Sequence, residues 1–111
     1  MADCLTGRPP AHPALAVGRF DLVTQFGLLG LTGDPEHFGR CFDALHQLLA
    51  PGGWCAGANW EARERTGRVR LTRALFQHAA RRDITFTTLR RVRSADPDFP
   101  AVWLYTGRSM R

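Results

Sequence analysis

The chain has 111 residues, 44% of them hydrophobic, and a formal net charge of +5 at pH 7. A chain of this length and composition supports one folded domain with its own core, which excludes a wholly disordered protein. It holds no apolar run near the roughly 20 residues that cross a bilayer, and residues 1–4 do not start a secretory signal, so we expect a cytoplasmic protein.

Every basic residue is an arginine, because the sequence contains no lysine. This composition is typical of a GC-rich genome, such as that of an actinobacterium. The charge is uneven: residues 63–93 hold ten arginines against two carboxylates, a local +8, and the rest of the chain carries −3. No aromatic-interleaved basic motif or helix-turn-helix pattern accompanies this patch, so we expect a solvated face or a protein contact rather than a nucleic-acid site.

Metal and thiol chemistry are not indicated by the spacing of cysteines and histidines. The three cysteines form no CxxC pair, and two of them, Cys41 and Cys55, fall on apolar faces where cysteine acts as a small hydrophobe. His37, His46 and His78 lie on predicted helices, where we expect surface or boundary positions. We therefore expect reduced thiols, no metal and no catalytic residue.

The first elements in chain order are an arm and a strand. Residues 1–18 carry three prolines among small residues and predict an extended N-terminal arm, which leaves residues 19–111 as the domain. Residues 20–26 are mostly apolar, which is typical of a strand buried on both faces of a parallel sheet. A glycine-bearing loop should follow over residues 27–33.

A helix is predicted from Asp34 to Ala50. Asp34 is a good N-cap, Pro35 suits the first helical turn, and Pro51 followed by two glycines predicts a tight return. One apolar stripe runs along this helix at spacings of three and four residues. Its members are Phe38, Phe42, Leu45 and Leu49.

The rest of the chain predicts a strand over 54–60, a loop over 61–69, a helix over 69–82 and two antiparallel strands over 84–93 and 101–106. The second helix is predicted from the spacing of Leu71, Leu75 and Ala79. The strand after it should present Ile84, Phe86, Thr88 and Val92 on one face. The order is βαβαββ, with the first two strands parallel through a right-handed crossover.

Four segments carry a resemblance to a known family. They are Phe20-Asp21-Leu22-Val23, the capped helix, Leu49-Ala50-Pro51-Gly52-Gly53, and Val102-Trp103-Leu104-Tyr105-Thr106-Gly107. Over residues 19–108 the chain resembles strands four to seven of a class I S-adenosylmethionine-dependent methyltransferase, and is most similar to the nicotinamide and phenylethanolamine N-methyltransferase group. The resemblance implies an α/β, partial Rossmann-like sheet that lacks the N-terminal, cofactor-binding half.

The resemblance also implies where the cofactor binds. In the family a glycine-rich turn after strand one and an acidic residue after strand two hold it. This chain has no GxGxG, and Asp34 caps the helix after its glycine loop, where it would repel an anion. We expect no cofactor binding by this chain alone, with S-adenosylmethionine held by a partner.

By position in the family, two loops could reach a composite site. Gln25 and Phe26 end strand four, and the alternative is a polar strand end beside a core aromatic residue. Asn59, Trp60 and Glu61 follow strand five, where Glu61 could bind an amine substrate and Trp60 could stack on it. The alternative there is an exposed loop with one packing aromatic residue.

The strand of residues 20–26 would be an unpaired, apolar edge, which is an aggregation hazard unless it is covered. We therefore predict a partner interface at Phe20, Leu22, Val23 and Phe26. The first hypothesis is a non-catalytic accessory subunit of a full-length small-molecule methyltransferase, in secondary metabolism. The alternatives are one half of a split methyltransferase with a composite active site, and a homodimeric binding module.

Overall fold

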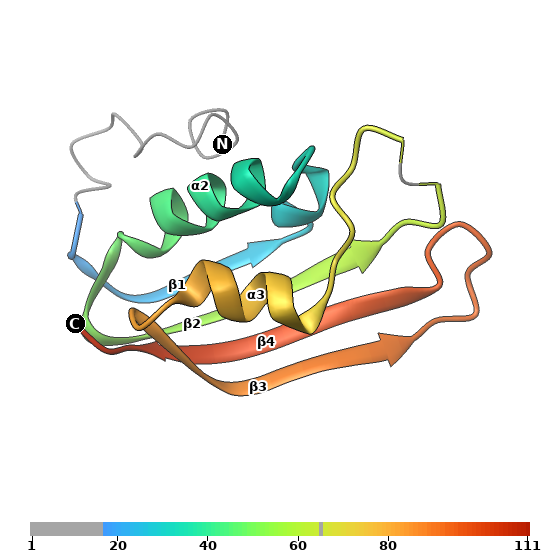
Figure 1. Cartoon of the computed structure of the whole chain (residues 1–111). Coiled ribbons are helices and arrows are strands. Elements are labelled where there is room, and N and C mark those ends of the chain that lie inside the picture. Colours follow the sequence, from blue (N-terminus) through green and yellow to red (C-terminus); the bar gives the residue numbers. More distant parts are fainter. Residues whose placement is uncertain (1–16, 65) are drawn as a thin grey trace.

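The computed structural model describes residues 17–64 and 66–111, so the predicted arm lies almost entirely outside the described residues. A four-stranded sheet carries two α-helices on one face (Figure 1). The strands are β1 (Phe20–Phe26), β2 (Leu49–Glu61), β3 (Ile84–Arg93) and β4 (Ala101–Ser109). The helices are a 3-10 turn, η2 (Leu29–Leu31), and two α-helices, α2 (Pro35–His46) and α3 (Arg73–Ala80). This order confirms the predicted βαβαββ pattern.

The sheet is mixed, with strand order β1-β2-β4-β3. β1 and β2 are parallel, and β4 pairs antiparallel with both β2 and β3. The predicted parallel and antiparallel pairs are therefore both present. The sequence did not predict that β4 lies between β2 and β3, which leaves β1 and β3 as the two edges of the sheet.

Helix α2 begins as predicted but ends earlier. The Asp34 carboxylate accepts a hydrogen bond from the His37 N–H at 2.8 Å, and Pro35 occupies the first turn. The helix ends at His46 rather than at Ala50, because Leu49 pairs with Phe20 as the first residue of β2. Leu49 is buried, so it fills the core from a strand and not from the predicted helical stripe.

The Pro51-Gly52-Gly53 segment is an irregularity within β2 and not a turn between two elements. The β1–β2 register shifts here, from Phe20 opposite Leu49 to Leu22 opposite Trp54. Gly52 has a φ of +75°, a conformation that glycine adopts without strain. The predicted positive φ is therefore present at Gly52, where the extra residues of β2 are accommodated.

Helix α3 is shorter than the predicted range of 69–82. Thr72 caps it by accepting a hydrogen bond from the Leu75 N–H at 3.1 Å. Leu71 is buried, but it lies in the extended segment before the helix, so the predicted stripe mixed helical and extended residues. The buried residues of α3 are Phe76 and Ala80, and Phe76 was absent from the predicted stripe.

The predicted alternation of β3 is wrong beyond Phe86. The β3–β4 register shifts between Phe86 and Thr88, so that Leu89 turns toward the core in place of Thr88. A bulge of this kind moves every later side chain to the opposite face. β4 is also longer than predicted, because Gly107 lies within the strand and Ser109 pairs with Ile84.

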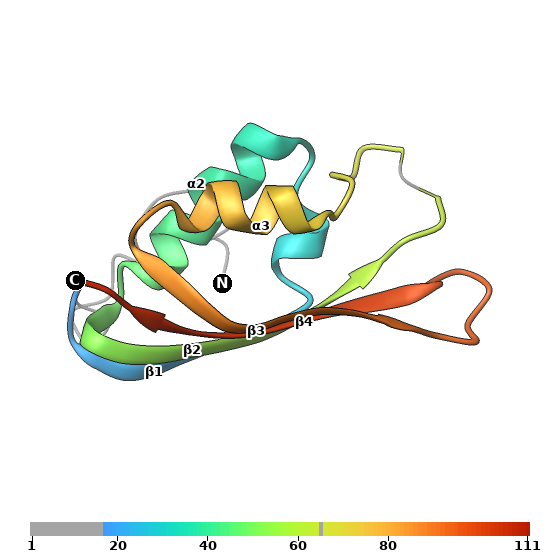
Figure 2. The same ribbon diagram turned by 60° about the horizontal axis from the view of Figure 1, so that its bottom comes forward.

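The core lies between the sheet and the two helices. Phe38 and Phe76 join α2 to α3 through an edge-to-face contact with a centroid distance of 5.2 Å. The Tyr105 ring of β4 packs against Phe76 and Phe42, at 5.8 and 6.2 Å. Figure 2 shows the two helices together on this side of the sheet, and within the described ranges no helix covers the other side.

Gly57 in β2 makes room for the Tyr105 ring, and this contact gives a stability prediction. A β-carbon at Gly57 would lie 2.6 Å from Tyr105 Cζ, whereas a β-carbon at Gly39 in α2 would meet nothing within 4 Å. We expect Gly57→Ala to lower the free energy of unfolding by about 1–3 kcal/mol through overpacking. The matched control, Gly39→Ala, should be neutral or stabilising by up to about 1 kcal/mol. Urea unfolding followed by circular dichroism would measure both, and equal effects would contradict this account.

Candidate functional site

Gln25 supports the turn that follows β1. Its side chain is buried, and its Oε1 accepts hydrogen bonds from the N–H groups of Leu28 and Leu29, at 3.1 and 3.5 Å. Its Nε2 donates to the Tyr105 hydroxyl at 3.3 Å. All these partners lie inside the protein, as a polar strand end would require. Phe26 points to the opposite face and is 78% exposed, so the alternative that placed it in the core is wrong.

Asn59 holds the same turn from β2. Its Oδ1 accepts hydrogen bonds from the N–H groups of Leu29 and Gly30, at 3.1 and 3.3 Å. The side chain is fully buried, and its Nδ2 has no hydrogen-bond partner among the described residues. Asn59 therefore positions η2 over the ends of β1 and β2, and its position as a substrate contact remains a prediction.

Glu61 is engaged by an arginine and a tryptophan. Arg91 donates to both carboxylate oxygens, at 3.0 and 2.8 Å, and the Trp103 indole N–H donates at 3.1 Å. The hydrogen bond and charge of Glu61 raise the pKa of the Arg91 guanidinium. The charge of Arg91 balances that of the Glu61 carboxylate. Through Arg91 and Trp103, Glu61 joins the ends of β2, β3 and β4.

Trp60, one of the predicted site residues, lines an open hollow at the end of β2. It is about half exposed and contacts Phe99 edge to face, with ring centroids 6.0 Å apart. Together with Leu31, Arg68 and two glycines of the loop after β1, these rings line a hollow of about 230 Å³. Trp60 and the loop after β1 therefore line the same hollow. Leu31, Arg68 and Phe99 belong to no motif from which the sequence could have predicted their place here.

Strand alternation separates the three predicted residues of the β2 end. Asn59 turns toward the helix-covered face, and Trp60 turns to the opposite face.

Glu61 lines a second hollow, of about 270 Å³, together with three arginines. They are Arg70, Arg73 and Arg91. Arg73 donates to the Leu89 carbonyl at 2.8 Å, so part of the arginine-rich segment stabilises the fold.

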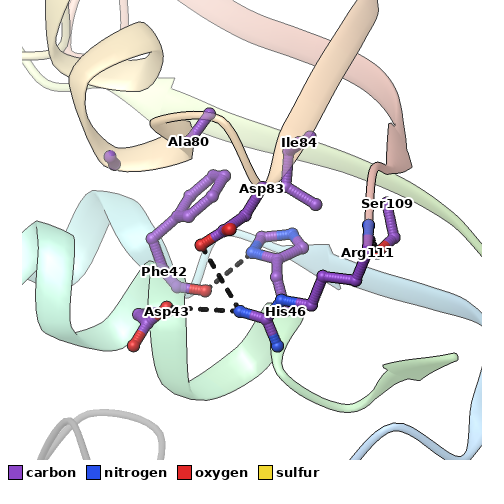
Figure 3. A pocket seen from close by; sticks show the side chains of 9 residues that line it. Phe42, Asp43, His46, Ala80, Asp83, Ile84, Ser109 and Arg111 are labelled. Atoms are coloured by element: carbon purple, nitrogen blue, oxygen red, sulfur yellow. Dashed lines mark hydrogen bonds and ion pairs between the residues drawn. The ribbon is translucent and has the colours of Figure 1, made fainter. Parts of the chain in front are cut away.

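His46 is buried, which corrects its expected boundary position. Its Nδ1 lies 2.7 Å from the Phe42 carbonyl (Figure 3), and its Nε2 lies 3.0 Å from the Tyr105 hydroxyl. A carbonyl only accepts, so Nδ1 carries the proton and Nε2 accepts from Tyr105. The Tyr105 hydroxyl in turn accepts from Gln25, which completes a chain of hydrogen bonds from α2 through β4 to β1.

Burial shifts the pKa values along this core. Burial lowers the pKa of His46 to about 4, against opposing effects of the Phe42 carbonyl and Asp43. It raises the pKa of Tyr105 above its ordinary value and that of the Cys55 thiol to about 11. Cys55 therefore stays protonated near pH 7 and is a poor nucleophile.

A metal site is not found within residues 17–64 and 66–111, where no three histidine, cysteine or acidic side chains are placed to hold an ion. The glycine loop after β1 also does not open an anion site, because the Asp34 carboxylate already accepts from the N-terminus of α2. At the N-terminus of α2 this carboxylate stands where an anionic group of a ligand would bind. No helix in the described part of the chain is long and apolar enough to span a membrane.

The buried His46 predicts a pH-dependent stability. Unfolded histidine binds a proton below about pH 6.5, while folded His46 does so only near pH 4, so stability falls as the pH drops between these values. The loss should reach about 3 kcal/mol. Asp43, Asp83 and Arg111 line the same hollow (Figure 3), where the Arg111 guanidinium lies 3.9 Å from the Asp43 carboxylate and 3.4 Å from that of Asp83.

The control for this prediction is His46→Gln, which does not titrate. Urea unfolding at several pH values between 7 and 4 should show a shallower pH dependence in this variant than in the wild-type chain. Parallel curves for the two proteins would contradict the assignment of the pH dependence to His46.

Comparisons with known proteins identify the fold. No protein-family model matches the sequence, and no curated protein matches it either. Among solved structures, the chain is similar to the N-methyltransferase NodS from Bradyrhizobium japonicum, with a TM-score of 0.67 and 18% identity over 86% of this chain and 54% of that one. NodS has also been solved in complex with S-adenosylhomocysteine.

Two further solved structures show the same likeness. One is the Burkholderia thailandensis 1,6-didemethyltoxoflavin-N1-methyltransferase with bound 1,6-didemethyltoxoflavin and S-adenosylhomocysteine, with a TM-score of 0.64 and 20% identity over 86% of this chain and 46% of that one. The other is the complex between a methyltransferase activator and a methyltransferase from Haloferax volcanii, with a TM-score of 0.64 and 12% identity over 90% and 58%.

These likenesses confirm the predicted fold class. The described residues form a partial Rossmann-like sheet of the class I S-adenosylmethionine-dependent methyltransferase type. The chain spans about half the length of the solved structures that it matches.

Proposed function

We propose that this chain is a non-catalytic subunit that binds and stabilises or activates a full-length S-adenosylmethionine-dependent methyltransferase of small-molecule, secondary metabolism in the cytoplasm. The observation that carries the proposal is a methyltransferase-type sheet in which β1 is an edge strand. In the Haloferax complex a methyltransferase and a separate activator polypeptide associate. The same kind of association would place S-adenosylmethionine in the partner of this chain.

The edge of β1 is the proposed contact. An edge strand presents unpaired N–H and C=O groups that can pair with a strand of another chain. Leu22 and Phe26 are exposed beside this edge and could add apolar contact, and Phe20 is partly buried against the core. Val23 is buried beneath the helices, so its contribution would be limited to its backbone.

Sequencing the genes beside this chain's gene, followed by co-expression with a full-length methyltransferase encoded there, would test the proposal. We expect the two proteins to elute together, and we expect titration calorimetry to detect S-adenosylmethionine binding by the complex but not by this chain alone. The physical reason is that Asp34 occupies the helix N-terminus that follows the glycine loop. Separate elution with unchanged partner activity, or tight cofactor binding by the isolated chain, would reject the proposal.

The Trp60 hollow favours a second candidate, one half of a split methyltransferase. Ligands of open α/β sheets bind beyond the carboxyl ends of the strands, and Trp60 and the Gly27 loop lie there on neighbouring strands. Gln25, Phe26 and Asn59 lie at the same ends of β1 and β2. In this reading Trp60 would stack on the substrate of a composite site.

Substitution of Trp60 distinguishes the two candidates. If the site is composite, Trp60→Ala should lower kcat/KM of the assembly by about tenfold or more, since an aromatic stacking contact is worth about 1–3 kcal/mol. Glu61→Gln is the comparator, because Glu61 bonds to Arg91 and Trp103 within the protein. At saturating subunit concentration, an accessory subunit with Trp60→Ala would leave the turnover of the assembled methyltransferase unchanged. A third candidate, a homodimeric binding module, would be identified by its mass in solution without partners.

A further inference from the structure

The sheet face opposite the helices carries a row of exposed apolar side chains. Three strands contribute to this apolar face. Its large members are Leu22, Phe26, Trp54, Trp60 and Leu104, which are between 37% and 78% exposed. Leu22 lies opposite Trp54, and Phe26 and Leu104 both lie opposite Ala58, so these residues form two apolar rows over β1, β2 and β4, with Thr24, Ala56 and Thr106 in the row between them. Large exposed apolar side chains gathered on one sheet face in this way mark an interaction site.

The parallel pair of the sheet favours a cover over this surface. Sheets made wholly of parallel strands occur almost only with both faces covered, and the β1–β2 part of this mixed sheet is parallel. Helices α2 and α3 cover one face, and no helix in residues 17–64 and 66–111 covers the other (Figure 2). An amphipathic helix is the usual cover for the outer face of such a sheet.

Positive charge borders the apolar face on the side of β3. Arg90 lies opposite Leu104, and Arg108 lies opposite Trp54, so both share the face. The Arg108 guanidinium lies 5.3 Å from the Trp54 ring centroid and donates to the Gly52 carbonyl at 3.2 Å. Neither arginine forms an ion pair with a carboxylate of the described residues. A complementary partner would therefore place carboxylates at this border.

We infer that the apolar face docks an amphipathic helix of a second polypeptide. Its apolar side would cover Trp54, Trp60 and Leu104, and its flanking carboxylates would pair with Arg90 and Arg108. A second copy of this chain is a poorer occupant, because it would bring the same positive border and no matching carboxylates to the interface. The inference rests on the proposed function only for the identity of the polypeptide, which is the methyltransferase partner.

Leu104→Glu tests the face separately from the strand edge, because Leu104 lies on β4, two strands away from β1. We expect this variant to bind the co-expressed methyltransferase about tenfold more weakly or worse, as for a central interface residue. The matched control is Met110→Glu, an exposed apolar residue beyond the end of β4. Its affinity should stay within about twofold of the wild type. Equal binding by Leu104→Glu and the wild type would overturn the docking face and leave the proposed function intact.

A partner-free experiment keeps the inference testable if that methyltransferase does not bind. The probe is a synthetic amphipathic helix of about five turns with a leucine stripe flanked by glutamates, compared with the same helix flanked by lysines. Trp54 and Trp60 lie on the face and Trp103 is buried, so docking should protect tryptophan fluorescence from acrylamide. We expect the glutamate helix to bind about tenfold more tightly than the lysine helix, a preference that Arg90→Glu should weaken.

The outcomes separate the two ideas. Binding of the glutamate helix without binding of the methyltransferase would reject the proposed function and support the docking face. Equal binding of both helices, or binding unchanged by Leu104→Glu, would overturn the inference. Sedimentation that shows a dimer of the isolated chain, abolished by Leu104→Glu, would also overturn it, because the occupant would then be a second copy.

Discussion

The Tyr105 ring is the centre of the packing between the sheet and the two helices. The ring lies among three phenylalanines from α2, α3 and β3, at centroid distances of 5.7–6.2 Å. Its hydroxyl connects His46 of α2 with Gln25 of β1. The ring occupies the space that a side chain at Gly57 would fill. One residue of β4 thereby sets the distance between the sheet and both helices.

This packing also decides what the opposite face of the sheet presents. Successive side chains of a strand point to opposite faces, so burial of Gln25 and Tyr105 turns Phe26 and Leu104 outward. Trp60 is turned outward in the same way beside the buried Asn59. Trp60 therefore belongs both to the apolar face and to the hollow, whose other lining residues include Gly30 and Leu31 of η2. A polypeptide that docks on the apolar face would approach Trp60.

Fold alone does not identify an activity, because one fold supports many functions. The described sheet is of the methyltransferase type, yet the glycine loop after β1 leads to a helix N-terminus that Asp34 already caps. Glu61 is held by Arg91 and Trp103, so its charge serves the end of the sheet. We base the proposed subunit role on these features.

Local chemistry determined much of the secondary structure. The cap at Asp34, the positive φ at Gly52 and the strand of residues 20–26 were readable because each depends on neighbouring residues. The predicted burial of that strand on both faces is wrong, because Leu22 and Phe26 are exposed. Of the predicted site, the sequence placed Trp60 at the end of β2 but could not show that Arg91, thirty residues after Glu61, balances its charge.

The order of the elements, the parallel and antiparallel pairs and the methyltransferase-type fold could be predicted from the residues alone. The position of β4 between β2 and β3, the place of Leu49 in a strand and the burial of Phe76 in the core were visible only in the folded structure. The physical reason is that each of these depends on packing between residues far apart in the chain, which outweighs local spacing and helix propensity.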